Sequence, residues 1–261
     1  MKTIAIDVGG TKIKYALYDG SLKNFESMPT PKNRKDFLLA ILKIAALYPD
    51  VNQIGIGLPG IIEKSGKILN LPNLNFLNNF NIIEYFSKPG FDVRIDNDVK
   101  CYLRAEIKKG LGKKHKDFVL LSIGTGIGGG IVVSGKIYSG QGSAGELGHM
   151  IIDSGKDLSF YAAGKTLKKF DKKEMQRVSK YLGYALINII NIFDPEAVLL
   201  SGGLVTNHLK EFLPAALKYA RANLISSKAK TTPVLKSELG EQAGVLGAGL
   251  LFGPGSGKIK A

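Results

Sequence analysis

The sequence "LSIGTGIGGGIVV", residues 121–133, holds five glycines and one threonine between two apolar runs. The apolar runs are typical of buried strands. Glycine weakens a strand, since it buries no side chain and loses much backbone freedom on folding. The cluster therefore indicates either a sharp turn between two strands or a place where a charged ligand touches bare backbone.

An earlier stretch repeats this plan. Residues 3–20, "TIAIDVGGTKIKYALYDG", and residues 118–136 both contain an apolar strand, a turn of glycine and threonine, and a second apolar strand. Further strands are predicted within 52–60, 91–98 and 195–203, and helices at 36–50, 98–109, 174–193 and 208–224. Strands that alternate with helices predict an α/β protein. The repeat predicts two similar lobes, residues 1–114 and 115–240, followed by a closing helix at 241–253.

The composition excludes several classes of protein. The 261 residues are 44% hydrophobic and 22% charged, as in an ordinary globular domain. Cys101 is the single cysteine, so an internal disulfide and a cysteine-rich zinc site are excluded. The first apolar run is broken at Asp7, so we expect no signal peptide. No window approaches the ~20 apolar residues of a membrane helix. We expect a cytoplasmic protein without a membrane partner.

The formal net charge is +14. Such an excess fits a nucleic acid, an anionic surface or a polyanionic substrate, and also a lysine-rich surface without a specific partner. The lysines are scattered in pairs rather than gathered in one arm, which favours the plain surface. The sequence contains no recognisable DNA-reading module, so we expect no nucleic-acid partner.

The two glycine turns are candidates for a phosphate site. A phosphate chain needs several backbone N–H groups pointing at it, and glycine lets the backbone come close. Neither turn is a Walker loop, and neither leads from strand into helix as dinucleotide-binding turns do. One such turn alone is more typical of a tight hairpin, but two, one in each lobe, favour a nucleotide. The hypothesis assigns to the phosphates Gly9, Gly10, Thr11, Lys12, Gly124, Thr125 and Gly126, with Gly128–Gly130 in the same cluster.

Acidic residues lie at the ends of two predicted strands. Asp7, beside the first turn, is placed either to hold magnesium through water or to cap the turn. Asp96, Asn97 and Asp98 follow a strand and precede a helix. Asp98 is either the N-cap of that helix or a general base that accepts a hydroxyl proton while Asn97 orients the substrate. If Asp98 is the base, Asp96 or Asn97 can cap the helix instead.

Two more segments carry candidate ligand contacts. Gly202 and Gly203 end a buried strand, where ligands of open α/β sheets collect, so they either flank the adenine or ribose or form a simple turn. Glu146 and His149 lie three residues apart among glycines and can together grip adjacent hydroxyl groups. The same pair can also ligate a metal, but the rest of a metal-binding set is missing.

Taken in order, these segments resemble the ROK family (repressor, open reading frame, kinase) of sugar kinases, which have the two-lobed, ribonuclease H-like fold of the actin-like ATPases. The matching segments run from residue 4 to residue 251: "IAIDVGGTKIKYAL" (4–17), "GIGLPGIIEKSGKILNLPNL" (55–74), "IDNDVK" (95–100), "LLSIGTGIGGGIVVSGKIYSG" (120–140), "GELGHM" (145–150), "NIFDPEAVLLSGG" (191–203) and "GVLGAGLL" (244–251). The resemblance implies that the C-terminal helix rejoins the N-terminal lobe and that a hexose binds in the cleft between the lobes.

The resemblance also implies roles for single residues. By this resemblance, Asp98 corresponds to the family's catalytic base, and the two glycine turns correspond to its phosphate cradle. Gly202 and Gly203 correspond to the adenosine edge. The implied sugar contacts are Gly60, Asn97, Glu146 and His149.

The chain departs from the family pattern in two places. Most members follow Gly-His with a cysteine cluster, Cys-x-Cys-Gly-x-x-Gly-Cys, that binds structural zinc together with the histidine. Here residues 148–167 read "GHMIIDSGKDLSFYAAGKTL", without cysteine, so we expect no zinc. Ser159 stands where the family usually has a glutamate that contacts the sugar, which leaves the identity of the sugar open.

The sequence thus predicts a glucokinase-like enzyme that uses ATP and Mg²⁺ to phosphorylate a hexose, and we expect a homodimer. Three alternatives stay open: a glucokinase that uses polyphosphate, a kinase for an amino or acetylated amino sugar, and a catalytically silent sugar sensor or regulator. The family's repressors carry a DNA-binding segment first, and Asp7 comes too early in this sequence for one.

Overall fold

The computed structural model describes residues 2–63, 65–71 and 73–253, and the chain divides into two compact units. Unit 1 comprises the residues up to Ala105 together with the segment from Glu241 onward, and unit 2 comprises Glu106–Gly240. The division falls inside helix α3 (Asp98–Lys109), not at the predicted boundary after residue 114. A continuous helix joins the two units at this point, so no linker marks the boundary in the sequence.

Unit 1 is built on a five-stranded sheet in the order β3-β2-β1-β4-β7. The strands are, in chain order, β1 (Thr3–Val8), β2 (Lys12–Tyr18), β3 (Leu22–Pro29), β4 (Gln53–Leu58) and β7 (Asp92–Asn97). The first three pair antiparallel, whereas β1, β4 and β7 pair in parallel. Asp7 lies opposite Gly57 of β4, which lies opposite Asp96 of β7. The acidic ends of β1 and β7 therefore lie at the same edge of the sheet.

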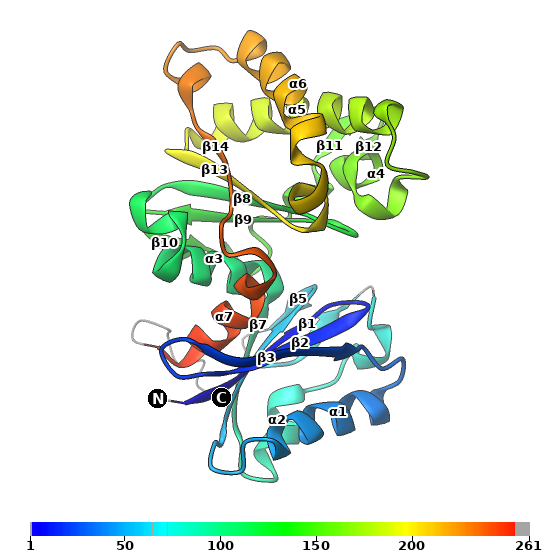
Figure 1. Ribbon diagram of the computed structural model, residues 1–261, viewed down its shortest axis with the longest axis vertical. Coiled ribbons are helices and arrows are strands. Elements are labelled where there is room, and N and C mark those ends of the chain that lie inside the picture. Colours follow the sequence, from blue (N-terminus) through cyan, green and yellow to red (C-terminus); the bar gives the residue numbers. More distant parts are fainter. Residues whose placement is uncertain (1, 64, 72, 254–261) are drawn as a thin grey trace. The chain divides into compact units, whose positions relative to one another are not determined.

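The alternation of β1 directs its side chains to two different cores. Ile4, Ile6 and Val8 are buried in the core that includes residues of α1 (Arg34–Ala46) and α2 (Ile82–Ser87). Ala5 packs on the other face, with residues of α3 and of α7 (Ala243–Gly249). Figure 1 shows α1 and α2 on one side of the strands and α7 on the other. Because Asp7 has the parity of Ala5, its carboxylate faces α7.

The closing segment packs against unit 1 through small residues. The structure has one short helix here, α7, between 3₁₀ turns at Gly240–Gln242 and Leu250–Phe252, where a single helix over 241–253 is predicted. A Cβ atom at Gly247 would collide with the carbonyl oxygen of Cys101. The "GVLGAG" pattern thus lets α7 lie directly on its neighbours.

Unit 2 repeats the plan of unit 1 with a sheet in the order β10-β9-β8-β13-β14. Its strands are β8 (Phe118–Ile123), β9 (Ile127–Val133), β10 (Lys136–Tyr138), β13 (Ala197–Ser201) and β14 (Val234–Lys236). Again the first three pair antiparallel, and β8, β13 and β14 pair in parallel. The repeat predicted between residues 3–20 and 118–136 is therefore a repeat of sheet topology.

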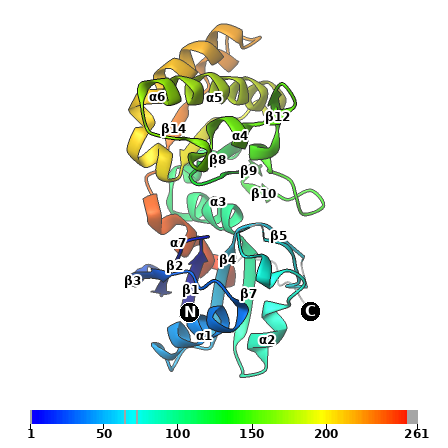
Figure 2. The ribbon, with the colours of Figure 1, turned by 90° about the vertical axis from the view of Figure 1, so that its right-hand side faces the viewer.

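Helices α5 (Lys172–Phe193) and α6 (Gly203–Asn223) pack on one face of this second sheet, as Figure 2 shows. The inward residues Val119, Leu121 and Ile123 of β8 belong to the core that these helices share. The smaller described elements are β5 (Ile61–Ile62), β6 (Ile68–Asn70), β11 (Ile151–Asp153), β12 (Lys156–Asp157), α4 (Leu158–Ala162) and 3₁₀ turns at Asn75–Leu77, Leu111–Lys114, Leu147–His149, Gly164–Thr166 and Ala229–Thr231. No helix among the described residues is long and apolar enough to span a membrane.

Some elements differ from the sequence prediction. Strand β3 is an edge strand with mostly half-buried and exposed positions, so it lacks an apolar pattern. Gly128–Gly130 continue as strand β9 and are not part of the turn. Gly129 is needed there because a Cβ atom would come within 2.5 Å of the carbonyl oxygen of Gly145. Its lack of a side chain thus lets the segment before Glu146 pack directly on β9.

Candidate active site

The first glycine turn, Gly9–Thr11, joins β1 to β2, and its carbonyl groups accept hydrogen bonds from other parts of unit 1. The Thr30 hydroxyl donates to the carbonyl of Gly9 (2.7 Å), and the Thr30 N–H donates to that of Thr11 (3.0 Å). The Lys32 ammonium donates to the carbonyl of Gly10 (3.0 Å). Among the described residues, no acceptor takes the N–H groups of Gly10 and Thr11. The turn thus presents unbonded donors and a nearby cation, as an anion requires.

The second glycine turn, Gly124–Gly126, joins β8 to β9 and is built in the same way. The N–H of Gly164 donates to the carbonyl of Gly124 (2.7 Å), and that of Lys165 donates to the carbonyl of Thr125 (3.1 Å). The N–H groups of Thr125 and Gly126 find no acceptor in the part of the chain that the structure describes. A Cβ atom at Gly126 would meet nothing within 4 Å. The space over this turn is therefore open.

The start of α6 lies beside the second turn. Gly202 has φ +96°, and a Cβ atom there would come within 2.5 Å of the carbonyl oxygen of Ile123, so this close approach requires glycine. Gly203 is the first residue of the 21-residue helix α6, whose first-turn N–H groups carry the positive end of the helix dipole. The Ser201 hydroxyl, just before them, is buried without a hydrogen-bond partner among the described residues. These groups add donors next to the turn.

Asp7 is a buried acid near a second acid. Its side chain is only 8% exposed, and a Cβ atom at Gly244 of α7 would collide with its carboxylate. Burial and, to a smaller extent, the negative charge of Asp98 raise the pKa of the Asp7 carboxyl to about 7, although Lys14 acts in the opposite sense. No hydrogen bond to this carboxylate occurs within the described residues. A group that is costly to ionise and has no donor is suited to a cation.

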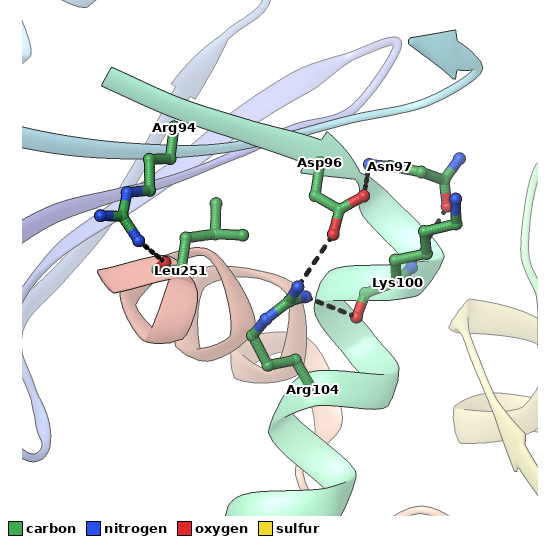
Figure 3. A network of polar contacts seen from close by, with 6 residues as sticks. All are labelled: Arg94, Asp96, Asn97, Lys100, Arg104 and Leu251. Carbon is green, nitrogen blue, oxygen red and sulfur yellow. Dashed lines mark hydrogen bonds and ion pairs between the residues drawn. The ribbon is translucent and has the colours of Figure 1, made fainter. Parts of the chain in front are cut away.

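The segment Asp96–Asp98 shows which residue caps α3. Asn97 Oδ1 accepts a hydrogen bond from the N–H of Lys100 (3.2 Å), so Asn97 is the N-cap (Figure 3). Asp96 accepts from the N–H of Asn97 (2.9 Å) and from the Arg104 guanidinium (3.0 Å), which occupies both its oxygens. The cap hypothesis for Asp98 is therefore wrong, and the alternative that Asn97 caps the helix is confirmed. Asp98 is the first residue of α3, and its Oδ1 accepts from the N–H of Val99 (2.8 Å).

Figure 3 also shows the contact between Arg94 of β7 and Leu251 of the closing segment. Arg94 donates to the carbonyl of Leu251 (2.9 Å), and its guanidinium lies 4.4 Å from the centre of the Phe252 ring, so the closing segment is tied to β7. The Asn97 amide donates to the carbonyl of Gly60 (3.0 Å). Gly60 has φ +123°, and a Cβ atom there would collide with the carbonyl oxygen of Asn70. The Asn97 amide therefore joins α3 to the "LPG" turn and keeps one further N–H for another contact.

Glu146 and His149 lie on an exposed loop of unit 2. The side chain of His149 is 70% exposed, and its Nδ1 lies 3.0 Å from Oδ2 of Asp157. Gly148 between them is required because a Cβ atom there would collide with the carbonyl oxygen of Ile127, and it would also come within 2.8 Å of the Ser159 hydroxyl. Ser159 itself is only 9% exposed. The loop is thus packed against α4 on one side and open on the other.

The sequence profile of the ROK family matches residues 3–167 and 156–253, which is nearly the whole chain. The chain belongs to the ROK family. The resemblance predicted from the ordered segments is confirmed.

ROK proteins of two kinds are similar to this chain. An N-acetyl-D-glucosamine kinase of Mannheimia succiniciproducens is 30% identical over 94% of this chain and 97% of that protein. A xylose repressor of Bacillus spizizenii is 32% identical over 74% of this chain and 59% of the repressor. Among solved structures, the ROK hexokinase of Thermus thermophilus has a TM-score of 0.79 and 28% identity, covering 96% of this chain and 97% of that one. The predicted α/β fold with two actin-like lobes is confirmed.

Several residues of this ROK protein that shape the candidate site were missed by the sequence analysis. Thr30 and Lys32 donate hydrogen bonds to the carbonyl groups of the first turn. Gly164 and Lys165 do the same at the second turn. Each of these donors lies far along the chain from its turn. Asp157 differs from these residues because it carries a sequence signal: an aspartate directly before an apolar segment is typical of a helix N-cap. Its contact with His149 is visible only in the structure.

Proposed function

We propose that this protein is a sugar kinase that transfers the terminal phosphoryl group of ATP to a hydroxyl group of a hexose, in the manner of a glucokinase. One observation carries the proposal. In each unit a glycine turn has its carbonyl groups bonded by the protein and its tip N–H groups unbonded among the described residues. A hairpin needs no such arrangement, whereas a phosphate chain does.

The two turns and the start of α6 supply the electrostatic part of the reaction. Phosphoryl transfer depends on positioning and on stabilising the charge of the transferred group. Thr125 and Gly126 offer backbone donors, and the N-terminus of α6 lies beside them. In unit 1, Gly10 and Thr11 offer the corresponding donors, with the Lys32 ammonium nearby. Gly202 and Gly203 lack side chains where the nucleoside would lie.

Asp98 is the residue that we propose as the general base. Its carboxylate accepts the proton of the sugar hydroxyl while the hydroxyl oxygen forms a bond to the terminal phosphorus of ATP and the bond to ADP breaks. Asn97 performs the capping of α3, so Asp98 is not required for that task. Asp7 lies opposite Gly57 and Gly57 opposite Asp96, so the strand that precedes Asp98 ends at the same sheet edge as β1, and the charge of Asp98 helps to raise the pKa of Asp7.

The chemistry of Asp7 fits a bound divalent cation. Its buried carboxylate has no hydrogen-bond donor among the described residues and a raised pKa. Magnesium, when bound with the nucleotide, would neutralise phosphate charge and stabilise the ionised form of this acid. Asp7 would hold it, directly or through water.

The acceptor that we propose is a hexose, and its proposed contacts are Asn97, Glu146 and His149, with Gly60 in addition. Glucose is the first candidate. An acetylated amino sugar is the second, because an N-acetyl-D-glucosamine kinase is 30% identical over nearly the whole chain and because a small residue, Ser159, replaces the usual glutamate.

Two further alternatives have an observation in their favour. Lys165, whose N–H bonds to the second turn, begins a lysine-rich segment, namely Lys165, Lys168, Lys169, Lys172 and Lys173, which suits polyphosphate as the donor. The xylose repressor relative favours a regulator that binds sugar without turning it over.

One experiment separates these functions. ADP release is followed with ATP and Mg²⁺ over glucose, other hexoses, amino sugars and acetylated amino sugars, with a parallel assay of sugar phosphate formed from polyphosphate. We expect turnover with ATP and one class of sugar. Sugar binding in calorimetry without turnover by any donor would identify a regulator and contradict the proposal.

A further inference from the structure

His149 is held at one ring nitrogen and open elsewhere. Nδ1 lies 3.0 Å from Oδ2 of Asp157, and the histidine side chain is 70% exposed against 26% for the aspartate. For Nε2, no hydrogen bond is found among the described residues. The partner of Nδ1 decides which nitrogen of a neutral imidazole carries the proton. A carboxylate accepts only, so Asp157 places the proton on Nδ1 and leaves a lone pair on Nε2.

Asp157 is itself fixed by a second hydrogen bond. Its Oδ1 accepts from the N–H of Phe160 (2.8 Å), which makes Asp157 the N-cap of α4. The two oxygens thus serve two different partners, one the backbone of a helix and one the imidazole. A carboxylate tied to a helix terminus cannot follow the ring if the ring turns, so it sets the orientation of His149.

The hairpin that carries Asp157 is anchored to two helices. Ile151 of β11 lies opposite Asp157 of β12. At the other end of β11, Asp153 accepts hydrogen bonds from two tyrosines, from the Tyr161 hydroxyl at its carbonyl (3.1 Å) and from the Tyr181 hydroxyl at its carboxylate (3.2 Å). The two tyrosine rings stack with their centres 3.7 Å apart. The hairpin is therefore held by α4 and α5.

We propose that Asp157 is a positioning residue for sugar recognition. It fixes His149 in the Nδ1–H form, so that Nε2 accepts a hydrogen bond from a hydroxyl group of the bound hexose. The inference rests on the proposed role of His149 in the sugar site. It adds Asp157, which does not itself touch the sugar. It also gives the hydrogen bond at His149 a direction, with the sugar hydroxyl as donor and Nε2 as acceptor.

The first test reads the proton position without any ligand. Nitrogen NMR of the imidazoles is tractable because the chain has three histidines. For the neutral imidazole of His149 in the unaltered protein, we expect the Nδ1–H form. In Asp157→Asn the amide N–H₂ faces Nδ1 while the amide oxygen keeps the helix cap, so the proton moves to Nε2. His208, whose Nδ1 contacts Glu211 (2.9 Å), is the internal control and should not change. A neutral Nε2–H form in the unaltered protein overturns the proposal.

The second test is kinetic. Asp157→Asn should lower kcat/KM for the sugar by about 2- to 10-fold, the usual effect of one lost hydrogen bond between neutral groups, with the KM for the nucleotide unchanged. Asp171→Asn is the matched control, because Asp171 caps α5 through the N–H of Glu174 (3.0 Å) but does not contact a histidine. Asp171→Asn should leave kcat/KM for the sugar and the KM for the nucleotide unchanged.

A double variant separates this proposal from the proposed function. In a His149→Ala background, Asp157→Asn should have no further effect on sugar kinetics, because it acts through the histidine. An equal loss in both backgrounds overturns the positioning role. If the proton moves in the NMR experiment but His149→Ala and Asp157→Asn both leave sugar kinetics unchanged, the structural link stands and the assignment of His149 to the sugar site fails.

Discussion

Asn97 Oδ1 accepts the N–H of Lys100 at 3.2 Å, so the helix that begins at the candidate base is capped by the residue before it. The same amide donates to the carbonyl of Gly60 at 3.0 Å. Asn97 therefore holds the "LPG" turn and the start of α3 together. Asp98 follows it directly and is not needed as the cap.

Replacing Asn97 should destabilise the fold through both bonds. Asn97→Ala removes the cap and the bond to Gly60, and we expect a loss of about 1–3 kcal/mol in the free energy of unfolding, measured by urea denaturation. Asn97→Asp keeps a cap acceptor but cannot donate to Gly60, so it should lose less. Equal stability of Asn97→Ala and the unaltered protein would contradict the assigned cap.

Asp7 should make the stability of the protein depend on pH in an unusual direction. Its pKa is about 7 in the folded chain against 3.8 for an ordinary aspartate, so the folded state binds the proton more tightly. Stability therefore falls as pH rises from about 4 to about 7. Asp7→Asn removes this loss. Without magnesium it should gain up to a few kcal/mol over the unaltered protein at pH 8, at about 1.4 kcal/mol per pKa unit, and nothing at pH 4.

A control for this experiment uses the second cause of the shift. Asp98→Asn removes the negative charge that helps to raise the pKa of Asp7, so the loss of stability should end at a lower pH and be smaller in total. Urea denaturation of both variants between pH 4 and pH 8 gives the comparison. Parallel curves for Asp7→Asn and the unaltered protein would show that Asp7 ionises normally.

Two glycines, one in the second turn and one in the strand that follows it, should respond differently to alanine. At Gly126 a Cβ atom meets nothing within 4 Å, so Gly126→Ala should change the free energy of unfolding by less than about 0.5 kcal/mol. The new methyl group would occupy the space proposed for phosphate, and we expect the KM for the donor to rise roughly tenfold. At Gly129 a Cβ atom would lie 2.5 Å from the carbonyl oxygen of Gly145, so Gly129→Ala should destabilise by about 1–3 kcal/mol. A stable Gly126→Ala variant with an unchanged donor KM would remove this turn from the donor site.

Metal analysis tests the consequence of the absent cysteines. The described residues contain no group of three or more His, Cys, Asp and Glu side chains suited to a metal ion. His149 has Asp157 as its neighbour, and Cys101 is buried in unit 1. We expect dialysed protein to contain no stoichiometric zinc by elemental analysis. One zinc per chain would mean that His149 binds metal with ligands that the structure does not bring together.

The sequence predicts the repeated strand–turn–strand plan because glycine and threonine inside an apolar run are typical of a turn between two strands. It does not decide between Asp98 and Asn97 as the cap, since both residue types cap equally well and only the hydrogen bond to Lys100 distinguishes them. The partners of the turns, such as Thr30, and the pairing of Asp157 with His149 depend on tertiary contacts. Strand β3 was missed because an exposed edge strand carries no apolar alternation.

The proposed role of Asp98 is tested by comparing Asp98→Asn with the unaltered protein in ADP release, using the best sugar found in the screen. Because Asn97 caps α3, the substitution should not destabilise the fold, and the binding of sugar and nucleotide should stay nearly unchanged. If Asp98 is the general base of a sugar kinase, kcat falls by about 10²- to 10⁴-fold. Near-normal turnover by Asp98→Asn would show that this residue is not the base and that the proposed mechanism is wrong.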